Sequence, residues 1–260
     1  MAPVRCCIGM ANVRAPQTRW TLSVGDALFR WRSYLPLGLL PLAGLAILRA
    51  TFPFGTEAAD LAWEACCVGL SLAGMALRVW TVGAAARGTS GRNTREQKAE
   101  TLNTTGPYSL VRHPLYLANG VIIMGLALFP HTWLLPPVVA ALTLVYYALI
   151  AAREEVFLRA RFGARWEGWA ERVPRLWPAF GHFVPAAEPW RWREALRREY
   201  HGLTLVLVLP IVIDVAEDLH ETGAFDLNPV WTVTAAIGLV LYVTVRFLAK
   251  RTRVLRPHAS

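Results

Sequence analysis

Apolar residues gather into six stretches along the chain, and polar or charged segments separate them. Most of the stretches approach the ~20 residues that an α-helix needs to cross ~30 Å of hydrocarbon. The third would span only about 24 Å at 1.5 Å per residue, so we expect it to be tilted or to begin in the interface. The pattern predicts an all-α fold, a polytopic membrane helical bundle of about six transmembrane helices. The stretches cover approximately residues 34–50, 61–86, 115–130, 133–152, 203–220 and 229–249.

The composition agrees with a membrane protein. Of the 260 residues, 55% are hydrophobic and 17% are charged, whereas soluble domains carry about 25% charged residues. The net charge of +9 could indicate nucleic acid, but the basic residues lie between apolar stretches and form no nucleic-acid-binding motif. The four cysteines form two adjacent pairs without C-x-x-C spacing, which argues against a zinc site. We therefore expect neither a nucleic-acid partner nor a bound metal.

The distribution of basic residues predicts the orientation in the membrane. Segments 87–113 and 153–202 and the C-terminal tail are rich in arginine and lysine, whereas segments 51–60, 130–132 and 221–229 contain neither. The positive-inside rule then places both termini in the cytoplasm. The short loops and the alanine- and arginine-rich composition indicate a multi-pass protein of a bacterial inner membrane.

Two further segments have the character of interfacial helices. In residues 153–173, phenylalanines and tryptophans lie among arginines and glutamates, which is typical of an amphipathic helix in the headgroup layer. We expect a break in this helix near Gly163. Residues 188–202 place Trp190 and Trp192 among arginines, and tryptophan is enriched at the membrane–water boundary.

A tight turn brings two polar segments together. The connection "PHT" (130–132) is short enough to make the stretches on either side an antiparallel helical hairpin. The segment "RHPLY" (112–116) begins the hairpin, and "REE" (153–155) follows it. Both should therefore lie on the cytoplasmic side and close to each other.

These segments carry a family resemblance. The run "GPYSLVRHPLY" (106–116), followed after the hairpin by "REEVFLRARFGARWEGWAERVPRLWP" (153–178), resembles the isoprenylcysteine carboxyl methyltransferase and phospholipid methyltransferase family. The hallmarks R-H-P-x-Y, E-E and F-G-x-x-W/Y…V-P occur here in order, over roughly residues 60–180. The resemblance implies a membrane-embedded enzyme that transfers a methyl group from S-adenosylmethionine (SAM) to a lipid or lipidated acceptor. Candidate acceptors are a phospholipid amine, a lipid phosphate and a prenylated cysteine carboxylate.

The charge pattern, the apolar stretches and the resemblance together divide the chain into three regions. Residues 1–33 would form a basic cytoplasmic extension, and residues 34–180 the membrane methyltransferase core. Residues 181–260 would add an interfacial helix and two transmembrane helices.

The family pattern implies where SAM binds. Glu154 suits the ammonium group of SAM, and Arg112 or the helix start that follows it suits the carboxylate. The rings of Tyr108 and Tyr116 offer faces to the adenine and to cationic groups. The full set of implied cofactor-binding residues is Asn93, Glu100, Thr101, Leu102, Asn103, Tyr108, Arg112, His113, Pro114, Leu115, Tyr116 and Glu154.

The catalytic roles depend on the acceptor. A carboxylate or phosphate oxygen is already anionic, so it requires only a cation to hold its charge, and Arg153 is the candidate. An amine must lose a proton to a base, and Glu155 or His113 would then serve. Since alignment and exclusion of water account for most of the catalysis of a direct displacement, these residues need to be held firmly.

Other interpretations are open at this point. Pro114 is favoured at the first helical position whatever the function, and the charges of the two segments could be solvated. A membrane NADPH-dependent reductase of sterol-reductase-like fold and a non-catalytic membrane scaffold are the alternative functions. Binding of SAM without binding of NADPH would distinguish the methyltransferase from the reductase.

Two sets of charged residues within apolar stretches require partners. Arg78 lies in the second stretch, where it must pair with a carboxylate, serve a function or extend toward the cytoplasm. Asp214, Glu217 and Asp218 share one helical face by their i, i+3 and i+4 spacing. They predict either a metal or headgroup site or a buried polar contact.

Overall fold

The computed structural model describes residues 38, 40–48, 56–86, 99–186, 188–252 and 254–255, and it contains helices but no strands over these ranges. The all-α prediction is therefore confirmed. The elements are α2 (Leu40–Ile47), α3 (Glu57–Ala84), α4 (Pro107–Leu110), α5 (Pro114–Leu128), α6 (Leu135–Phe162), α7 (Ala164–Ala170), the short 3₁₀ turn η2 (Phe180–His182), α8 (Trp192–Glu221) and α9 (Pro229–Arg251).

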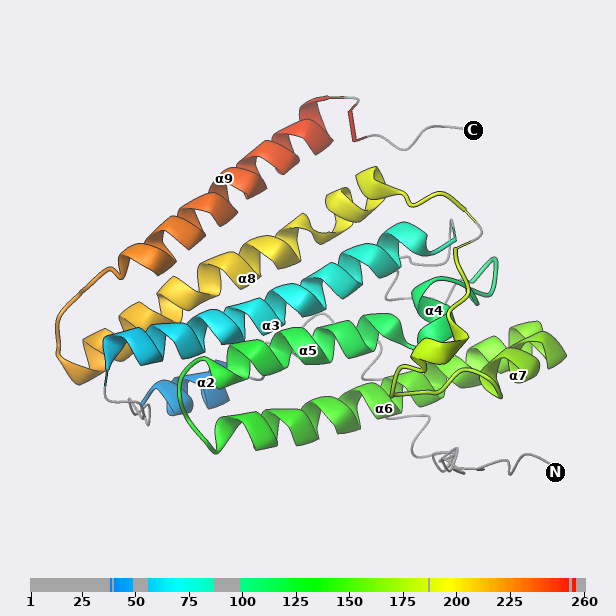
Figure 1. The fold of residues 1–260 in the computed structure, drawn as a ribbon, viewed down its shortest axis with the longest axis horizontal. Coiled ribbons are helices and arrows are strands. Elements are labelled where there is room, and N and C mark those ends of the chain that lie inside the picture. The colour runs from blue at the N-terminus through cyan, green and yellow to red at the C-terminus, as the bar shows by residue number, and fades with distance from the viewer. Residues whose placement is uncertain are drawn as a thin grey trace, which may run out of the picture.

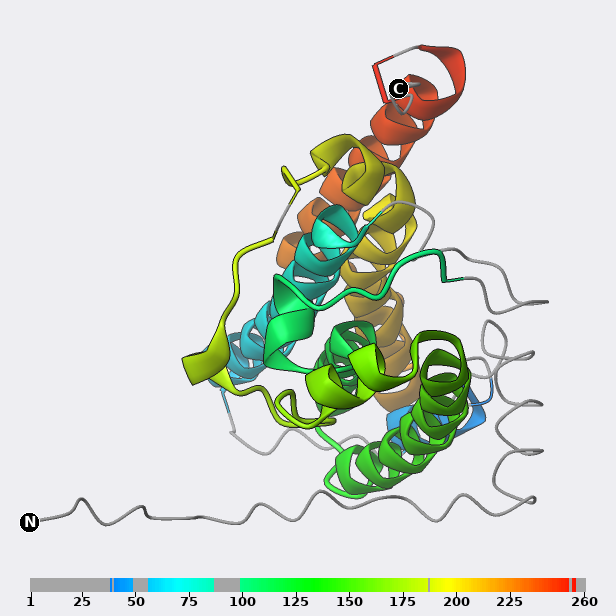
Figure 2. The ribbon, with the colours of Figure 1, turned by 90° about the vertical axis from the view of Figure 1, so that its right-hand side faces the viewer.

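Within the described residues, the five helices of 15 or more residues form the bundle, in the spatial order α6, α5, α3, α8 and α9 (Figure 1). Each runs antiparallel to its neighbour, and the short α2 contacts α6 and α8. Figure 2 looks along the bundle from the end that carries α4 and α7. The predicted hairpin is present as α5 and α6, so the start of α5 and the C-terminal part of α6 lie at this end.

The bundle has the composition of a membrane protein. By length and apolarity, α3, α6 and α9 can each cross a membrane, and α5 is a shorter apolar helix of 15 residues, about 22 Å long. The helical membrane bundle is thus confirmed, with the third apolar stretch as short as expected. The predicted stretch 34–50 lies partly outside the described residues. The extension 1–33 and Asn93 lie wholly outside them.

The boundaries of two helices differ from those expected. The predicted span 133–152 and the amphipathic segment after it form one helix, α6, of 28 residues. Charged side chains beginning at Arg153 do not stop a helix. The break comes at Gly163, as predicted, where φ is +52° and glycine has no steric penalty. For the same reason, α8 begins at Trp192, inside the predicted interfacial segment 188–202, and continues without interruption through the predicted span after it.

Small residues bring α3 and α5 close together. A Cβ added to Gly74 would lie 2.8 Å from the carbonyl oxygen of Ala118, and one added to Gly125 would lie 2.5 Å from the carbonyl oxygen of Cys67. The hydroxyl of Ser71 donates to the carbonyl of Ile122 at 3.1 Å. Close backbone approach at small residues is the usual basis of helix association in membranes.

Replacing Gly74 by leucine should therefore destabilise the bundle. The added side chain has no space against α5, and overpacking costs about 1–3 kcal/mol. The thermal midpoint in lipid nanodiscs measures the effect. Gly69→Leu is the control, because a Cβ at Gly69 on the same helix meets nothing within 4 Å. Equal midpoints for the two variants would contradict the proposed close packing.

Candidate active site

The segment before α5 is shaped by glycine and proline. Gly106 adopts a φ of +60°, and Pro107 begins the single turn α4. The chain is then extended at Val111, and Pro114 begins α5. Proline suits this position because a first-turn N–H has no intrahelical partner. Arg112 and His113 are thereby placed at the mouth of the α5–α6 hairpin.

The chain between α7 and α8 returns across this segment and is fastened to it by backbone hydrogen bonds. The N–H of Arg112 donates to Pro174 at 2.9 Å, and that of Gly106 donates to Val184 at 2.8 Å. The indole of Trp169 adds a bond to the carbonyl of Tyr108 at 3.2 Å. Tyr108 of this segment packs against a small hydrophobic core, which consists of Leu102, Trp166, Trp169, Ala170 and Val173.

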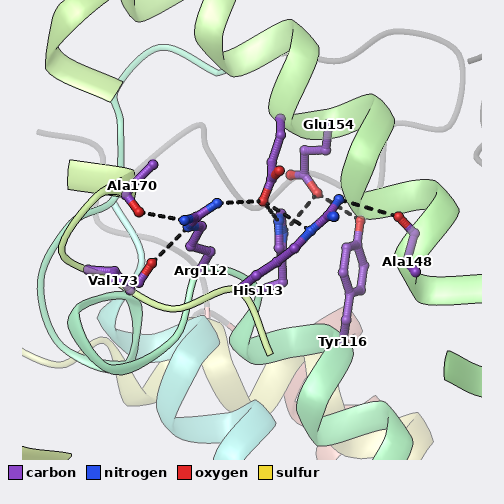
Figure 3. Close-up of polar contacts among 9 residues, drawn as sticks. Arg112, His113, Tyr116, Ala148, Glu154, Ala170 and Val173 are labelled. Carbon is purple, nitrogen blue, oxygen red and sulfur yellow. Dashed lines mark hydrogen bonds and ion pairs between the residues drawn. The ribbon is translucent and has the colours of Figure 1, made fainter. Parts of the chain in front are cut away.

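The guanidinium of Arg112 connects three parts of the chain and is buried (Figure 3). It donates to the carbonyl of Val173 at 2.8 Å and to that of Ala170. It also pairs with the carboxylate of Glu155 at 3.3 Å. These contacts tie the end of α7 to α5 and α6. Arg112 therefore has a structural role whether or not it also contacts a ligand.

The carboxylate of Glu155 is buried among three basic side chains. Its Oε1 lies 3.3 Å from Arg112, 3.2 Å from His113 Nε2 and 3.3 Å from Arg175 Nε. Arg175 also donates to the carbonyl of Ala148 at 3.4 Å. The sequence did not single out Arg175, although it directly follows the V-P pair of the family pattern. The predicted cation Arg153 is half-buried and precedes Glu154 and Glu155 on α6.

Glu154 differs from its neighbour because about a third of its side chain, 34%, remains exposed. Its Oε2 accepts a hydrogen bond from the hydroxyl of Tyr116 at 2.8 Å and lies 3.6 Å from His113 Nδ1. One carboxylate of the pair is thus enclosed in the protein. The other is held in place and can still reach a cationic group of a ligand.

His113 lies between the two carboxylates. Burial lowers its pKa, but hydrogen bonds and charge interactions with Glu154 and Glu155 outweigh burial, so that the pKa of His113 is raised. The two carboxylates thus stabilise the charged form of the imidazole relative to the neutral form. The imidazole also stacks on Tyr116, with ring centroids 5.3 Å apart. His113 is therefore held from both sides by carboxylates and from one face by an aromatic ring.

The other predicted cofactor residues are distributed around the same end. Burial and the charge of Glu154 raise the pKa of Tyr108, whose backbone lies over α7. Asn103 accepts a hydrogen bond from the N–H of Ala86 at 2.9 Å, and Leu102 belongs to the small core. Pro114 is buried and Leu115 half-buried, whereas Glu100 and Thr101 are exposed.

The charged residues predicted inside the apolar stretches, Arg78 and the group around Glu217, lie near other polar side chains. Arg78 pairs with Glu199 at 2.7 Å, which is the carboxylate partner expected as one possibility. Glu217 is buried near Glu64 of α3, and Glu64 accepts from the indole of Trp231 at 2.8 Å. Over the described ranges, no group of three or more His, Cys, Asp or Glu side chains could hold a metal ion.

The raised pKa of His113 predicts a pH dependence of stability. The contribution of the imidazolium is complete below 6.5, the ordinary pKa, and is lost as the pH rises through the raised value. The thermal midpoint should therefore fall with rising pH in the wild-type protein. His113→Asn should remove that part of the slope. A slope that is unchanged in the variant would assign the pH dependence to other groups.

Two curated proteins are similar to this chain. The Cobalt-zinc-cadmium resistance protein CzcN of Cupriavidus metallidurans is 28% identical over 127 residues, which cover 49% of this chain and 58% of the relative. The Nickel-cobalt-cadmium resistance protein NccN of Alcaligenes xylosoxydans xylosoxydans is 39% identical over 88 residues, or 34% of this chain and 40% of the relative. The chain thus spans about half the length of these relatives. No solved structure matches the chain.

A family model covers the helices that build the site. Residues 65–165 match the model described as Phospholipid methyltransferase, and this range contains α5, α6 and the segment between α3 and α5. The match confirms the resemblance found in the RHPLY and REE segments, and it supports a membrane methyltransferase. The residues Arg112, His113, Tyr116, Glu154 and Glu155 therefore all lie in the part of the chain that matches the phospholipid methyltransferase family.

Proposed function

We propose that the protein is a membrane-embedded methyltransferase that uses SAM and acts on a lipid or lipidated acceptor. Its site is the cluster at the mouth of the α5–α6 hairpin. We also propose a bacterial inner membrane with both termini in the cytoplasm, because the basic segments lie at the site end of the helices. SAM from the cytoplasm and an acceptor from the bilayer would then meet at this depth.

The observation that carries the proposal is the contrast between Glu154 and Glu155. Glu155 has basic partners on several sides and is buried. Glu154 keeps 34% of its side chain exposed while Tyr116 holds it in place. A fixed, accessible carboxylate at the end of a membrane hairpin suits the ammonium group of SAM, because a charge-assisted hydrogen bond is the strong kind.

The surrounding aromatic side chains hold Glu154 in position. The ring of Tyr116 stacks on those of His113 and Tyr147, with centroids 5.3 Å and 5.0 Å away. Tyr108 lies close enough to Glu154 to be influenced by its charge. SAM, when bound here, supplies an electrophilic methyl group. The chain's own residues bind it, orient it and keep water away.

The state of the basic and acidic groups favours an acceptor that is already anionic. An amine acceptor requires a base, but His113 is held between two carboxylates and Glu155 is paired with cations. A phosphate or carboxylate oxygen requires no base. Arg175, with 21% of its side chain exposed, and Arg153 are then the residues that would hold the negative charge of the acceptor.

The names of the two relatives suggest a second setting for the same reaction. Both are named for resistance to divalent metals. We propose that a protein of this kind contributes to metal resistance by transferring a methyl group to a component of the cell envelope. Lipid extracts for the assay should therefore come from cells grown with and without cobalt, zinc and cadmium.

Purified protein in nanodiscs should transfer labelled methyl groups from SAM to a component of such extracts. Glu154→Gln should reduce this transfer at least about 10-fold, because a hydrogen bond to a charged group contributes about 1.5–3 kcal/mol. Glu171→Gln is the control, since Glu171 is an exposed carboxylate beyond α7.

Three outcomes would contradict the proposal. Equal transfer by both variants would remove Glu154 from the site. Oxidation of NADPH without methyl transfer would favour the reductase, and neither activity with any extract would favour the scaffold.

A further inference from the structure

A buried polar chain lies below the site and includes residues of α8, outside the matched family region. Arg78 of α3 donates from Nε and Nη2 to the two carboxylate oxygens of Glu199 at 2.7 Å and 3.0 Å. Its third nitrogen, Nη1, donates to the side-chain oxygen of Asn119 on α5. Three helices are thus joined by one guanidinium.

This series of buried polar contacts continues from Asn119 to the site. Asn119 is hydrogen-bonded to Tyr147 of α6, and the ring of Tyr147 stacks on that of Tyr116, with centroids 5.0 Å apart and an interplanar angle of 16°. Tyr116 in turn donates its hydroxyl to Glu154. Asn119 follows Tyr116 by three residues on α5, so the two side chains share a face of the helix.

The geometry points to Glu199 and Arg78 as positioning residues for methyl transfer. Glu199 fixes the guanidinium of Arg78, which fixes Asn119, and Asn119 and Tyr147 together set the ring of Tyr116 that holds Glu154. This inference rests on the proposed function of the α5–α6 site. It gives a role to α8, which no family pattern covers, since residues 65–165 end before it.

Physical reasons support a positioning role over simple packing. Glu199 is buried, with 6% of its side chain exposed, whereas the Arg78 side chain is 24% exposed. Removing one partner of such a pair leaves a buried charge without compensation. Arg78 would then turn toward other acceptors or toward water. The first group to lose its constraint is Asn119, because it shares the same guanidinium.

The test compares Glu199→Gln with Glu194→Gln on the same helix. Glu194 pairs with Arg191 and Arg198, whereas Glu199 pairs with Arg78. Glu199→Gln should raise the KM for SAM about 3- to 10-fold, the range typical of coupling between separate sites, with little change in kcat. Glu194→Gln should leave both unchanged. Tyr147→Phe should raise KM similarly, and the double variant no further, because both changes break one chain.

Hydrogen exchange gives a readout that does not depend on the cofactor. Glu199→Gln should increase amide exchange in the first turns of α5, residues 114–119, and Glu194→Gln should not. A lower thermal midpoint with unchanged KM and unchanged exchange in this range would show that Glu199 serves packing alone. Additive effects of Glu199→Gln and Tyr147→Phe would also overturn the inference. If the wild-type protein transfers no methyl group, the proposed function fails. Amide hydrogen exchange then tests by itself whether Glu199 and Arg78 constrain the start of α5.

Discussion

The carboxylate of Glu155 is the group on which the site end of the protein depends. A carboxylate in the buried part of a helix is costly unless charges and hydrogen bonds compensate for it. Here the compensation comes from Arg112 and His113 at the start of α5 and from Arg175 in the chain that follows α7. To satisfy one charge, the protein must bring these three segments together. Arg112 then secures the return segment further, through the carbonyls of Ala170 and Val173.

Glu154 and Glu155 are adjacent on one helix but have different environments. Glu155 is neutralised within the protein, whereas Glu154 accepts a hydrogen bond from Tyr116, lies 3.6 Å from His113 Nδ1 and keeps 34% of its side chain exposed. Of the two adjacent carboxylates, one is thus enclosed by basic side chains, and the other is the one that we propose binds a ligand. The rings of His113, Tyr116 and Tyr147 are stacked beside the second.

The sequence predicted the parts of this arrangement that depend on local pattern. The tight turn at 130–132 implied that RHPLY and REE lie together, and His113 is indeed 3.2 Å from Glu155. Arg78 was expected to need a partner, but Glu199 could not be identified, because 121 residues separate the two and only the packing of α3 on α8 joins them. Arg175 and the carbonyl partners of Arg112 were missed for a similar reason. Their position depends on the path of an irregular segment, and a backbone carbonyl leaves no signal in a sequence.

The central claim is that the accessible carboxylate of Glu154 binds the ammonium group of SAM. Calorimetric titration of the protein in nanodiscs with SAM and with an analogue that lacks the α-ammonium group tests it most directly. The wild-type protein should bind SAM more tightly than the analogue by about 10- to 100-fold, the equivalent of one hydrogen bond between charged groups. Glu154→Gln should lose this preference while binding the analogue as the wild-type protein does. A preference for SAM that persists in Glu154→Gln, or equal weakening of both ligands, would contradict the account.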